Sequence, residues 1–250
     1  MDLLVLNPNT SESISVRLGH HVAAAIAALD PSARVRTATA AFGASYIADE
    51  TSFAIAGHAA LDAAATAVAR HGEPDALLLG CFGDPGIEAL REFSACPVVG
   101  LAEASMREAA KHGRFAIVTG GRAWAPMLER IARGLGHGAA LTGVHTVSAS
   151  GAELAADPAA AIDLLRNACI AASHGANAVI LGGAGLAGLA EPIASSLGVP
   201  LIDSVAAGAR ALWVAATEGR SGSAPSRAAS AIASRAQWQG LSAPLMDRLG

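Results

Sequence analysis

The sequence predicts an α/β fold with two pseudo-symmetric α/β domains, mainly parallel sheets, and an active site in the cleft between the domains. Three observations support this prediction. Short apolar runs alternate with longer alanine-rich stretches, one order of segments occurs twice, and glycine-rich loops follow several of the apolar runs. The chain has 250 residues, which is enough for one large domain or two small domains with buried cores.

The alternation of short and long segments defines the expected elements. Continuous apolar strands separated by helices are typical of parallel sheets that are covered on both faces. We expect strands over Leu3–Leu6, Val35–Thr39, Ala76–Leu79, Val98–Leu101, Phe115–Val118, Gly143–Val147, Ala178–Leu181 and Leu201–Ile202. We expect helices over Glu12–Leu29, Ala54–His71, Ile87–Phe93, Ala123–Leu135 and Ala159–His174. The Ser- and Gly-rich segment Gly219–Ala229 predicts a surface connection before a final helix.

An internal repeat divides the chain. The run DALLLGCFG begins at Asp75, and the similar run NAVILGGAG begins 102 residues later at Asn177. After a helical stretch, each run is followed by a proline and a second short strand, at Pro97 and Pro200. The same order at nearly one offset indicates an ancient duplication.

The repeat also predicts the domain boundaries. The first domain covers residues 1–100, and the second covers residues 101–207. We expect the C-terminal segment 208–250 to join the first domain.

Composition argues against several kinds of partner. The net charge of −4 and the aromatic content of 4% offer neither a basic surface nor stacking surfaces for nucleic acid. Charged residues or His interrupt the alanine-rich runs well before 18 residues, which argues against a transmembrane helix, and the chain opens on a strand-like run instead of a signal peptide. The three cysteines have no metal-ligand spacing. We expect a cytoplasmic protein that binds a small molecule and uses neither a metal nor another cofactor.

Candidate site residues follow the expected strands, because ligands of parallel α/β sheets bind beyond the carboxyl ends of the strands. The candidates for substrate binding in these loops are Asn9, Thr10, Phe82, Gly83, Thr119, Gly120, Gly183, Ala184 and Gly185. Ser45 is a further candidate for the pocket wall, together with Phe42, Tyr46 and Trp124.

Some of these residue types have a second explanation. Asn9 and Glu12 have the spacing of a capping box, which accounts for Asn9 and Thr10 equally well. Thr119 and the two glycines after it suit an oxyanion, but tight turn geometry explains the glycines as well. Both alternatives stay open at the level of sequence.

Cys81 is the one side chain in these loops with nucleophilic or proton-transfer chemistry near neutral pH. Asp84 and Pro85 predict a helix start just past it, with Asp84 as N-cap, and the amides of a helix N-terminus would lower the pKa of the Cys81 thiol. The alternative is a small buried residue at a strand end. The position between glycines favours the reactive role, whereas Cys96 and Cys169 lack this setting.

Three segments are similar to the aspartate/glutamate racemase superfamily and most closely resemble its hydantoin and allantoin racemases. They are NPNTS from Asn7, CFGDPG from Cys81 and GLAEA from Gly100, and the resemblance extends to about Arg210. It implies two α/β domains around a cleft and a cofactor-independent racemase or isomerase that acts on a carbon next to a carbonyl or carboxyl. A carboxylate or hydantoin substrate and a homo-oligomer are implied as well.

The resemblance also identifies a departure from the family. Racemases of this type use two cysteines on opposite faces of the substrate, of which the first matches Cys81 as acid/base and the second falls at Gly183. Glycine carries no proton, so three explanations stay open. Another group replaces the second thiol; Cys81 works alone, as in single-cysteine decarboxylases or cis-trans isomerases of the superfamily; or Gly183 inactivates the enzyme. A protein that only binds a small carboxylate is the non-enzymatic alternative.

Overall fold

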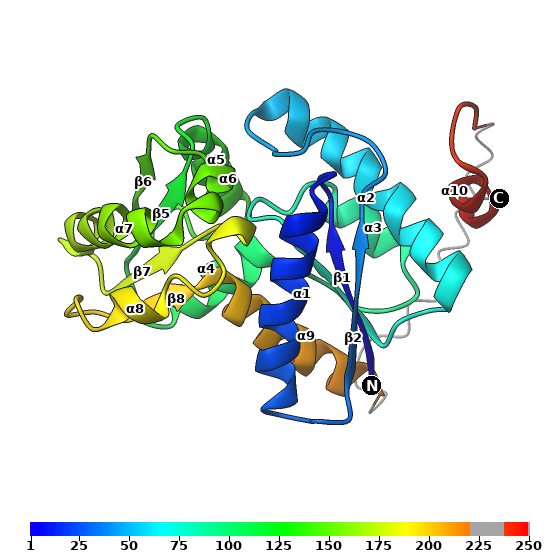
Figure 1. Cartoon of the computed structure of the whole chain (residues 1–250), viewed down its shortest axis with the longest axis horizontal. Helices are drawn as coiled ribbons and strands as arrows, with labels where there is room; N and C mark the ends of the chain where they lie inside the picture. Colours follow the sequence, from blue (N-terminus) through cyan, green and yellow to red (C-terminus); the bar gives the residue numbers. More distant parts are fainter. Residues whose placement is uncertain (221–237, 250) are drawn as a thin grey trace.

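The computed structural model describes residues 1–220 and 238–249, which form two four-stranded sheets and the helices around them (Figure 1). The first sheet has the order β2-β1-β3-β4 and contains β1 (Asp2–Asn7), β2 (Arg34–Thr39), β3 (Ala76–Leu79) and β4 (Val98–Gly100). The second sheet has the order β6-β5-β7-β8 and contains β5 (Phe115–Gly120), β6 (Leu141–Val147), β7 (Ala178–Leu181) and β8 (Leu201–Asp203). All neighbouring strands are parallel. The shared order confirms two pseudo-symmetric α/β halves.

The helices follow the strands along the chain. They are α1 (Glu12–Ala27), α2 (Glu50–His71), α3 (Ile87–Phe93), α4 (Leu101–Ala110), α5 (Trp124–Gly134), α6 (Gly151–Ala156), α7 (Pro158–Ser173), the 3-10 turn η1 (Ala184–Leu186), α8 (Glu191–Ala194), α9 (Ser204–Arg220) and α10 (Ala243–Leu249). Every strand and helix predicted above is present, and the predicted connection over 219–229 lies outside the described residues from residue 221 on.

Several predicted boundaries differ from the structure by one to four residues, and two of them have a clear local cause. Helix α2 begins at Glu50 instead of Ala54, because the Asp49 side chain caps it by accepting a hydrogen bond from the amide of Ser52 at 2.8 Å. The strand predicted to end at Leu101 ends at Gly100, since Leu101 is already the first residue of α4.

Strand side chains alternate between two faces, which creates three apolar cores. In β1, Leu3 and Val5 face a central core, while Leu4 and Leu6 face an outer core that is shared with α2 and α3. The central core also contains Ile117 of β5 and residues of α1, α4, α5 and α9. A separate outer core of the second half lies between its sheet and helices that include α7. Both sheets therefore share one continuous core.

Two helices, α4 and α9, each pack against the sheet other than the one whose last strand they follow in the chain. Helix α4 follows β4 but contacts β7 and β8, and α9 follows β8 but contacts β3 and β4. In Figure 1, α9 (orange) lies beside α1 (blue), and α10 lies beyond α2 at the far side of the first half. The domain boundaries at residues 100 and 207 stay a prediction.

Helix α2 differs from the sequence expectation about membrane spans. Its 22 residues have a window of mean hydropathy 1.3, so by length and composition alone it could cross a membrane. Its interruptions by His58 and Asp62 are too few to prevent this. In the structure a face of buried alanines, including Ala56, Ala60 and Ala63, packs on the first half, as in the core helix of a globular domain.

Candidate active site

A cavity lies between the two halves at the carboxyl ends of their strands. The cavity has a volume of about 50 Å³. The first half lines it with Asn9, Ile14, Tyr46, Ile47, Gly80, Cys81 and Phe82. The second half lines it with Thr119, Gly120, Trp124, Gly151, Gly182, Gly183, Ala184, Gly185 and Leu186. Among these described residues none has a charged side chain, and within 1–220 and 238–249 no group of three or more His, Cys, Asp or Glu could hold a metal ion.

Most predicted site residues meet in this cavity. Cys81 lies there with Asn9, Phe82, Thr119, Gly120, Gly183, Ala184 and Gly185. Thr10, Ser45 and Gly83 do not line it. The amide of Thr10 donates to the carbonyl of Ala44 at 3.1 Å, and Ser45 is exposed. Gly83 is covered by Trp124, whose ring would lie 2.6 Å from a Cβ at this position.

Cys81 is held in a tight turn at the end of β3. The amide of Gly80 still donates to Leu6 of β1 at 2.7 Å, and the carbonyl of Cys81 then accepts from the amides of Gly83 at 2.9 Å and Asp84 at 3.1 Å. Only 8% of Cys81 is exposed. Burial, and to a smaller degree the charge of Asp84, raises the pKa of the Cys81 thiol above its usual range. The expected lowering of this pKa is therefore wrong, because burial outweighs the helix.

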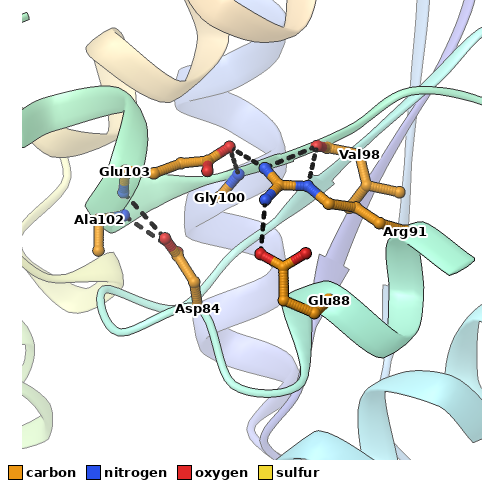
Figure 2. A network of polar contacts seen from close by, with 7 residues as sticks. All are labelled: Asp84, Glu88, Arg91, Val98, Gly100, Ala102 and Glu103. Carbon is orange, nitrogen blue, oxygen red and sulfur yellow. Dashed lines mark hydrogen bonds and ion pairs between the residues drawn. The ribbon is translucent and has the colours of Figure 1, made fainter. Parts of the chain in front are cut away.

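The role expected for Asp84 is also wrong. Helix α3 begins at Ile87 with Gly86 as its N-cap, so Asp84 does not cap it. The Asp84 side chain instead accepts hydrogen bonds from Ala102 at 3.0 Å and Glu103 at 2.9 Å, in the first turn of α4 (Figure 2). The φ of Asp84 is +53°, which places its backbone in the left-handed region.

Asn9 presents a hydrogen-bond donor to the cavity. Its Oδ1 accepts from Asn7 Nδ2 and from the amide of Ser11, both at 2.9 Å, so the Nδ2 group is left for a ligand. The N-cap of α1 is Ser11, so the capping box predicted for Asn9 and Glu12 does not form. The Glu12 carboxylate instead accepts from the hydroxyl of Thr39 at 2.9 Å.

Backbone amides and a hydroxyl complete the polar lining. The amide of Gly83 is used by Cys81, and the amide of Gly183 donates to Ser204 Oγ at 3.1 Å. In the part of the chain that the structure describes, no acceptor is present for the amides of Phe82, Ala184 and Gly185 or for the hydroxyl of Thr119. Such a set of donors around a thiol suits a substrate oxygen that gains negative charge.

Gly183 borders the cavity beside these donors. Its φ is +144°, and a Cβ built on it would lie 3.3 Å from Leu186 Cγ and 3.9 Å from Thr119 Oγ1. A side chain at this position would thus point along the wall formed by Leu186 and Thr119. Among the described lining residues, the cavity therefore contains one thiol, that of Cys81 on the first-half side, and a glycine without a side chain at position 183 on the second-half side.

Tyr46 lines the cavity and bonds to the second half, whereas the sequence indicated it only as a candidate for the pocket wall. Its hydroxyl donates to the carbonyl of Gly120 at 3.4 Å and accepts from the amide of Gly151 at 3.1 Å, so it connects the halves. Burial raises the pKa of Tyr46. The neighbouring wall residue Trp124 contacts the ring of Phe53, with centroids 6.3 Å apart. Tyr46 lies between β2 and α2, so the strand-end rule could have identified it.

Four other wall residues had no sequence signal, because Ile14, Ile47, Gly151 and Leu186 look like ordinary apolar or turn residues in the sequence. Gly80 and Gly182 directly follow the predicted strands Ala76–Leu79 and Ala178–Leu181, so the strand-end rule includes them. Phe42, the remaining candidate for the wall, packs on His58 in the outer core, with ring centroids 5.0 Å apart.

Comparisons with known proteins agree with this architecture. Residues 3–212 match the family model described as Asp/Glu/Hydantoin racemase. The chain is 37% identical over 139 residues to a hydantoin racemase of Pseudomonas sp. (strain NS671). This match covers 54% of the chain and 56% of the relative, so the chain matches about half the length of that curated protein.

Two solved structures are similar over a longer stretch. The allantoin racemase from Pseudomonas fluorescens superposes with a TM-score of 0.83 and 28% identity, covering 96% of this chain and 100% of that one. The allantoin racemase from Klebsiella pneumoniae gives 0.80 and 28%, covering 88% and 89%. With the family model matching most of its length, the chain belongs to the Asp/Glu/hydantoin racemase family.

Proposed function

We propose that this protein is a racemase of uncharged cyclic amides of the hydantoin type, with Cys81 as its acid/base. The observation that carries the proposal is a cavity between the halves that holds one thiol and, among the described lining residues, no charged side chain. Similarity to a hydantoin racemase and to two allantoin racemases supports the same substrate class.

The uncharged lining favours a cyclic amide over a free amino acid. Aspartate and glutamate carry an ammonium and two carboxylates, and burying such charges without partners costs several kcal/mol, on the order of the penalty for any buried ion. A hydantoin ring presents N–H and C=O groups, which pair with neutral donors and acceptors. Asn9, Thr119 and the free amides are groups of this kind.

The proposed reaction begins at Cys81. Its thiolate removes the proton from the ring carbon next to the carbonyl, and the electron pair of the C–H bond moves onto the carbonyl oxygen. The amides of Phe82, Ala184 and Gly185, with the Thr119 hydroxyl, are placed to stabilise that charge. Loss of one such donor typically lowers the rate by ~10²–10³.

Return of a proton to the opposite face completes racemisation. With no thiol at Gly183, a water molecule in the adjacent space would donate the proton, and the resulting hydroxide would take the proton from the Cys81 thiol. The protons are then balanced, because the carbon has changed its configuration while the water molecule and the Cys81 thiolate are regenerated.

Proton NMR in D₂O, combined with optical rotation, tests the proposal on single-enantiomer 5-substituted hydantoins. We expect the signal of the C5 proton and the rotation to disappear together. Cys81→Ser should lower both rates by at least ~10²-fold. Cys169→Ala is the matched control, because Cys169 is fully buried in α7 away from the cavity, and it should keep both rates. Absence of exchange in the unmodified protein would rule out this function.

A single thiol also suits the second candidate, a cofactor-independent decarboxylase or cis-trans isomerase in which Cys81 works alone. The observation that favours it is that Cys81 is the one thiol among the described residues that line the cavity. Proton exchange with retention of rotation would show that Cys81 acts on one face only. Carbon dioxide release from malonate-type substrates would then identify the decarboxylase.

Assembly and location are proposals of the same kind. We expect a cytoplasmic homo-oligomer that binds neither nucleic acid nor membrane. Size-exclusion chromatography with light scattering measures the assembly, and a monomer at micromolar concentration would contradict it.

A further inference from the structure

We infer that Asp84 is a positioning residue that holds Cys81 at the cavity by binding the first turn of α4 and that its charge controls the ionisation of Cys81 (Figure 2). The inference rests on the proposed function, in which Cys81 is the acid/base.

Asp84 is connected to Cys81 on one side and to α4 on the other. Its amide donates to the Cys81 carbonyl at 3.1 Å, inside the turn that carries the thiol. Its two carboxylate oxygens accept separately from Ala102 and Glu103. Because both oxygens are used, the side chain cannot rotate without losing a bond, and the turn is fixed to α4.

The backbone is built around this contact. A Cβ on Gly100 would collide with the Asp84 carboxyl group, so the glycine makes room for it. Asp84 itself is the one described residue other than glycine with a positive φ. A left-handed conformation costs about 1 kcal/mol or more for a residue with a side chain, and it persists here because the carboxylate is held.

The neighbouring charges leave Asp84 without a cation of its own. Arg91 is paired with Glu103 and with Glu88, and its remaining bonds go to the carbonyl of Val98. Burial raises the pKa of Asp84 to about 7, although the hydrogen bonds from the amides of Ala102 and Glu103 lower it. The charges of Glu103 and Arg91 make smaller contributions of opposite sign. Asp84 therefore changes charge in the range where an enzyme of this kind works.

The consequence for Cys81 follows from the sign of that charge. Asp84 and Tyr46 are the titratable groups that face the thiol. An ionised Asp84 disfavours a second negative charge on Cys81, and a neutral residue does not. Asp84 thereby holds the thiol in place, and its charge favours the protonated thiol.

Alkylation of Cys81 measures the effect of Asp84 on the thiol and does not require the protein to be an active racemase. The rate of iodoacetamide modification at Cys81 is followed by peptide mass spectrometry across the pH range. In Asp84→Asn the midpoint of the pH profile should fall by about 1 pH unit, which makes alkylation near pH 8 about tenfold faster. A general loosening of the turn would raise the rate at every pH and leave the midpoint unchanged.

Two further variants separate charge from position. Glu103→Gln is the matched control, since it changes a carboxylate to an amide in the same network without touching the turn, and its midpoint should equal that of the unmodified protein. Gly100→Ala displaces the Asp84 carboxylate but keeps its charge, so it should raise the alkylation rate of Cys81 with a smaller change in midpoint. It also tests the positioning role if Asp84→Asn does not fold.

Each outcome has one meaning. An unchanged midpoint in Asp84→Asn, or an equal shift in Glu103→Gln, overturns the control of ionisation, and an unchanged rate in Gly100→Ala overturns the positioning. If alkylation behaves as expected but the unmodified protein exchanges no hydantoin proton, the inference about Asp84 stands and the proposed reaction fails. If the protein exchanges the proton but the variants show no shift in alkylation, the proposed reaction stands and the inference about Asp84 fails.

Discussion

At the scale of single residues, Gly183 is the position at which the sequence resemblance predicts a second cysteine, and this remains a prediction. A Cβ here would contact Leu186 and Thr119, and the φ of +144° is one that residues with side chains rarely adopt. A thiol placed here would lie on the side of the cavity opposite the half that carries Cys81.

Gly183→Cys should therefore increase racemisation relative to proton exchange on a single-enantiomer hydantoin, since the new thiol can return a proton to the second face. Gly183→Ala introduces the same backbone strain, about 1–3 kcal/mol, without a thiol. Both variants should melt at lower temperature than the unmodified protein. An equal ratio of rotation loss to exchange in both variants would count against a second-face role for this position.

Cys81 makes the rate depend on pH. Burial and the charge of Asp84 raise the pKa of its thiol, so the thiol is protonated at neutral pH and the base form increases with rising pH. We expect the exchange rate at low substrate concentration to increase from pH 6 to pH 8 by less than about tenfold per pH unit, because Asp84 also becomes charged in this range and disfavours the thiolate. A stopped-flow or NMR pH profile checks this, and a flat profile would mean that Cys81 is already ionised.

At the scale of elements, the N-terminus of α4 connects the turn that carries Cys81 to α3 and β4. The Glu103 side chain is 8% exposed, accepts from the amide of Gly100 and is paired with Arg91, whose side chain is 22% exposed (Figure 2). Removal of one partner from a buried pair is costly because the other charge is left without compensation.

Arg91→Ala should lower the free energy of unfolding by about 2–3 kcal/mol, somewhat less than for a fully buried pair because Arg91 is partly exposed. Arg130→Ala is the matched control, since Arg130 pairs with Glu50 and both side chains are more than half exposed. It should leave the urea midpoint unchanged. Equal midpoints for the two variants would show that the network around α4 contributes little.

At the scale of the whole molecule, α9 joins the halves by packing on the first sheet after leaving the second. Gly208 allows the close approach, because a Cβ there would lie 2.5 Å from Leu101 Cδ2 and 3.1 Å from Leu78 Cδ1. Gly219 in the same helix meets only Pro97 Cγ, at 3.4 Å, and Cδ, at 3.7 Å.

Gly208→Ala should destabilise the protein by about 1–3 kcal/mol through overpacking. Gly219→Ala should be neutral or stabilise it by up to about 1 kcal/mol, because alanine is the better helix former. Urea unfolding of both variants measures the difference. The same small effect in both would show that α9 does not press on the first sheet.

Local pattern accounts for what the sequence could predict. The apolar runs that begin at Leu3, Ala76, Phe115 and Ala178 form strands, because consecutive apolar residues favour a strand that is buried on both faces. The duplication predicted two sheets of one order, and the strand-end rule brought Cys81, Thr119 and Gly183 to one cavity.

Contacts between distant residues could not be read in this way. Asp84 binds amides 18 and 19 residues away instead of capping the next helix, and Tyr46 reaches an amide 105 residues away. The pKa of Cys81 also moves in the direction opposite to the local expectation. The sequence by itself determined the strands, the repeat and the position of the thiol, since these follow from neighbouring residues. Only the tertiary structure decided the partners and the ionisation of the site, because burial and capping depend on residues that folding brings together.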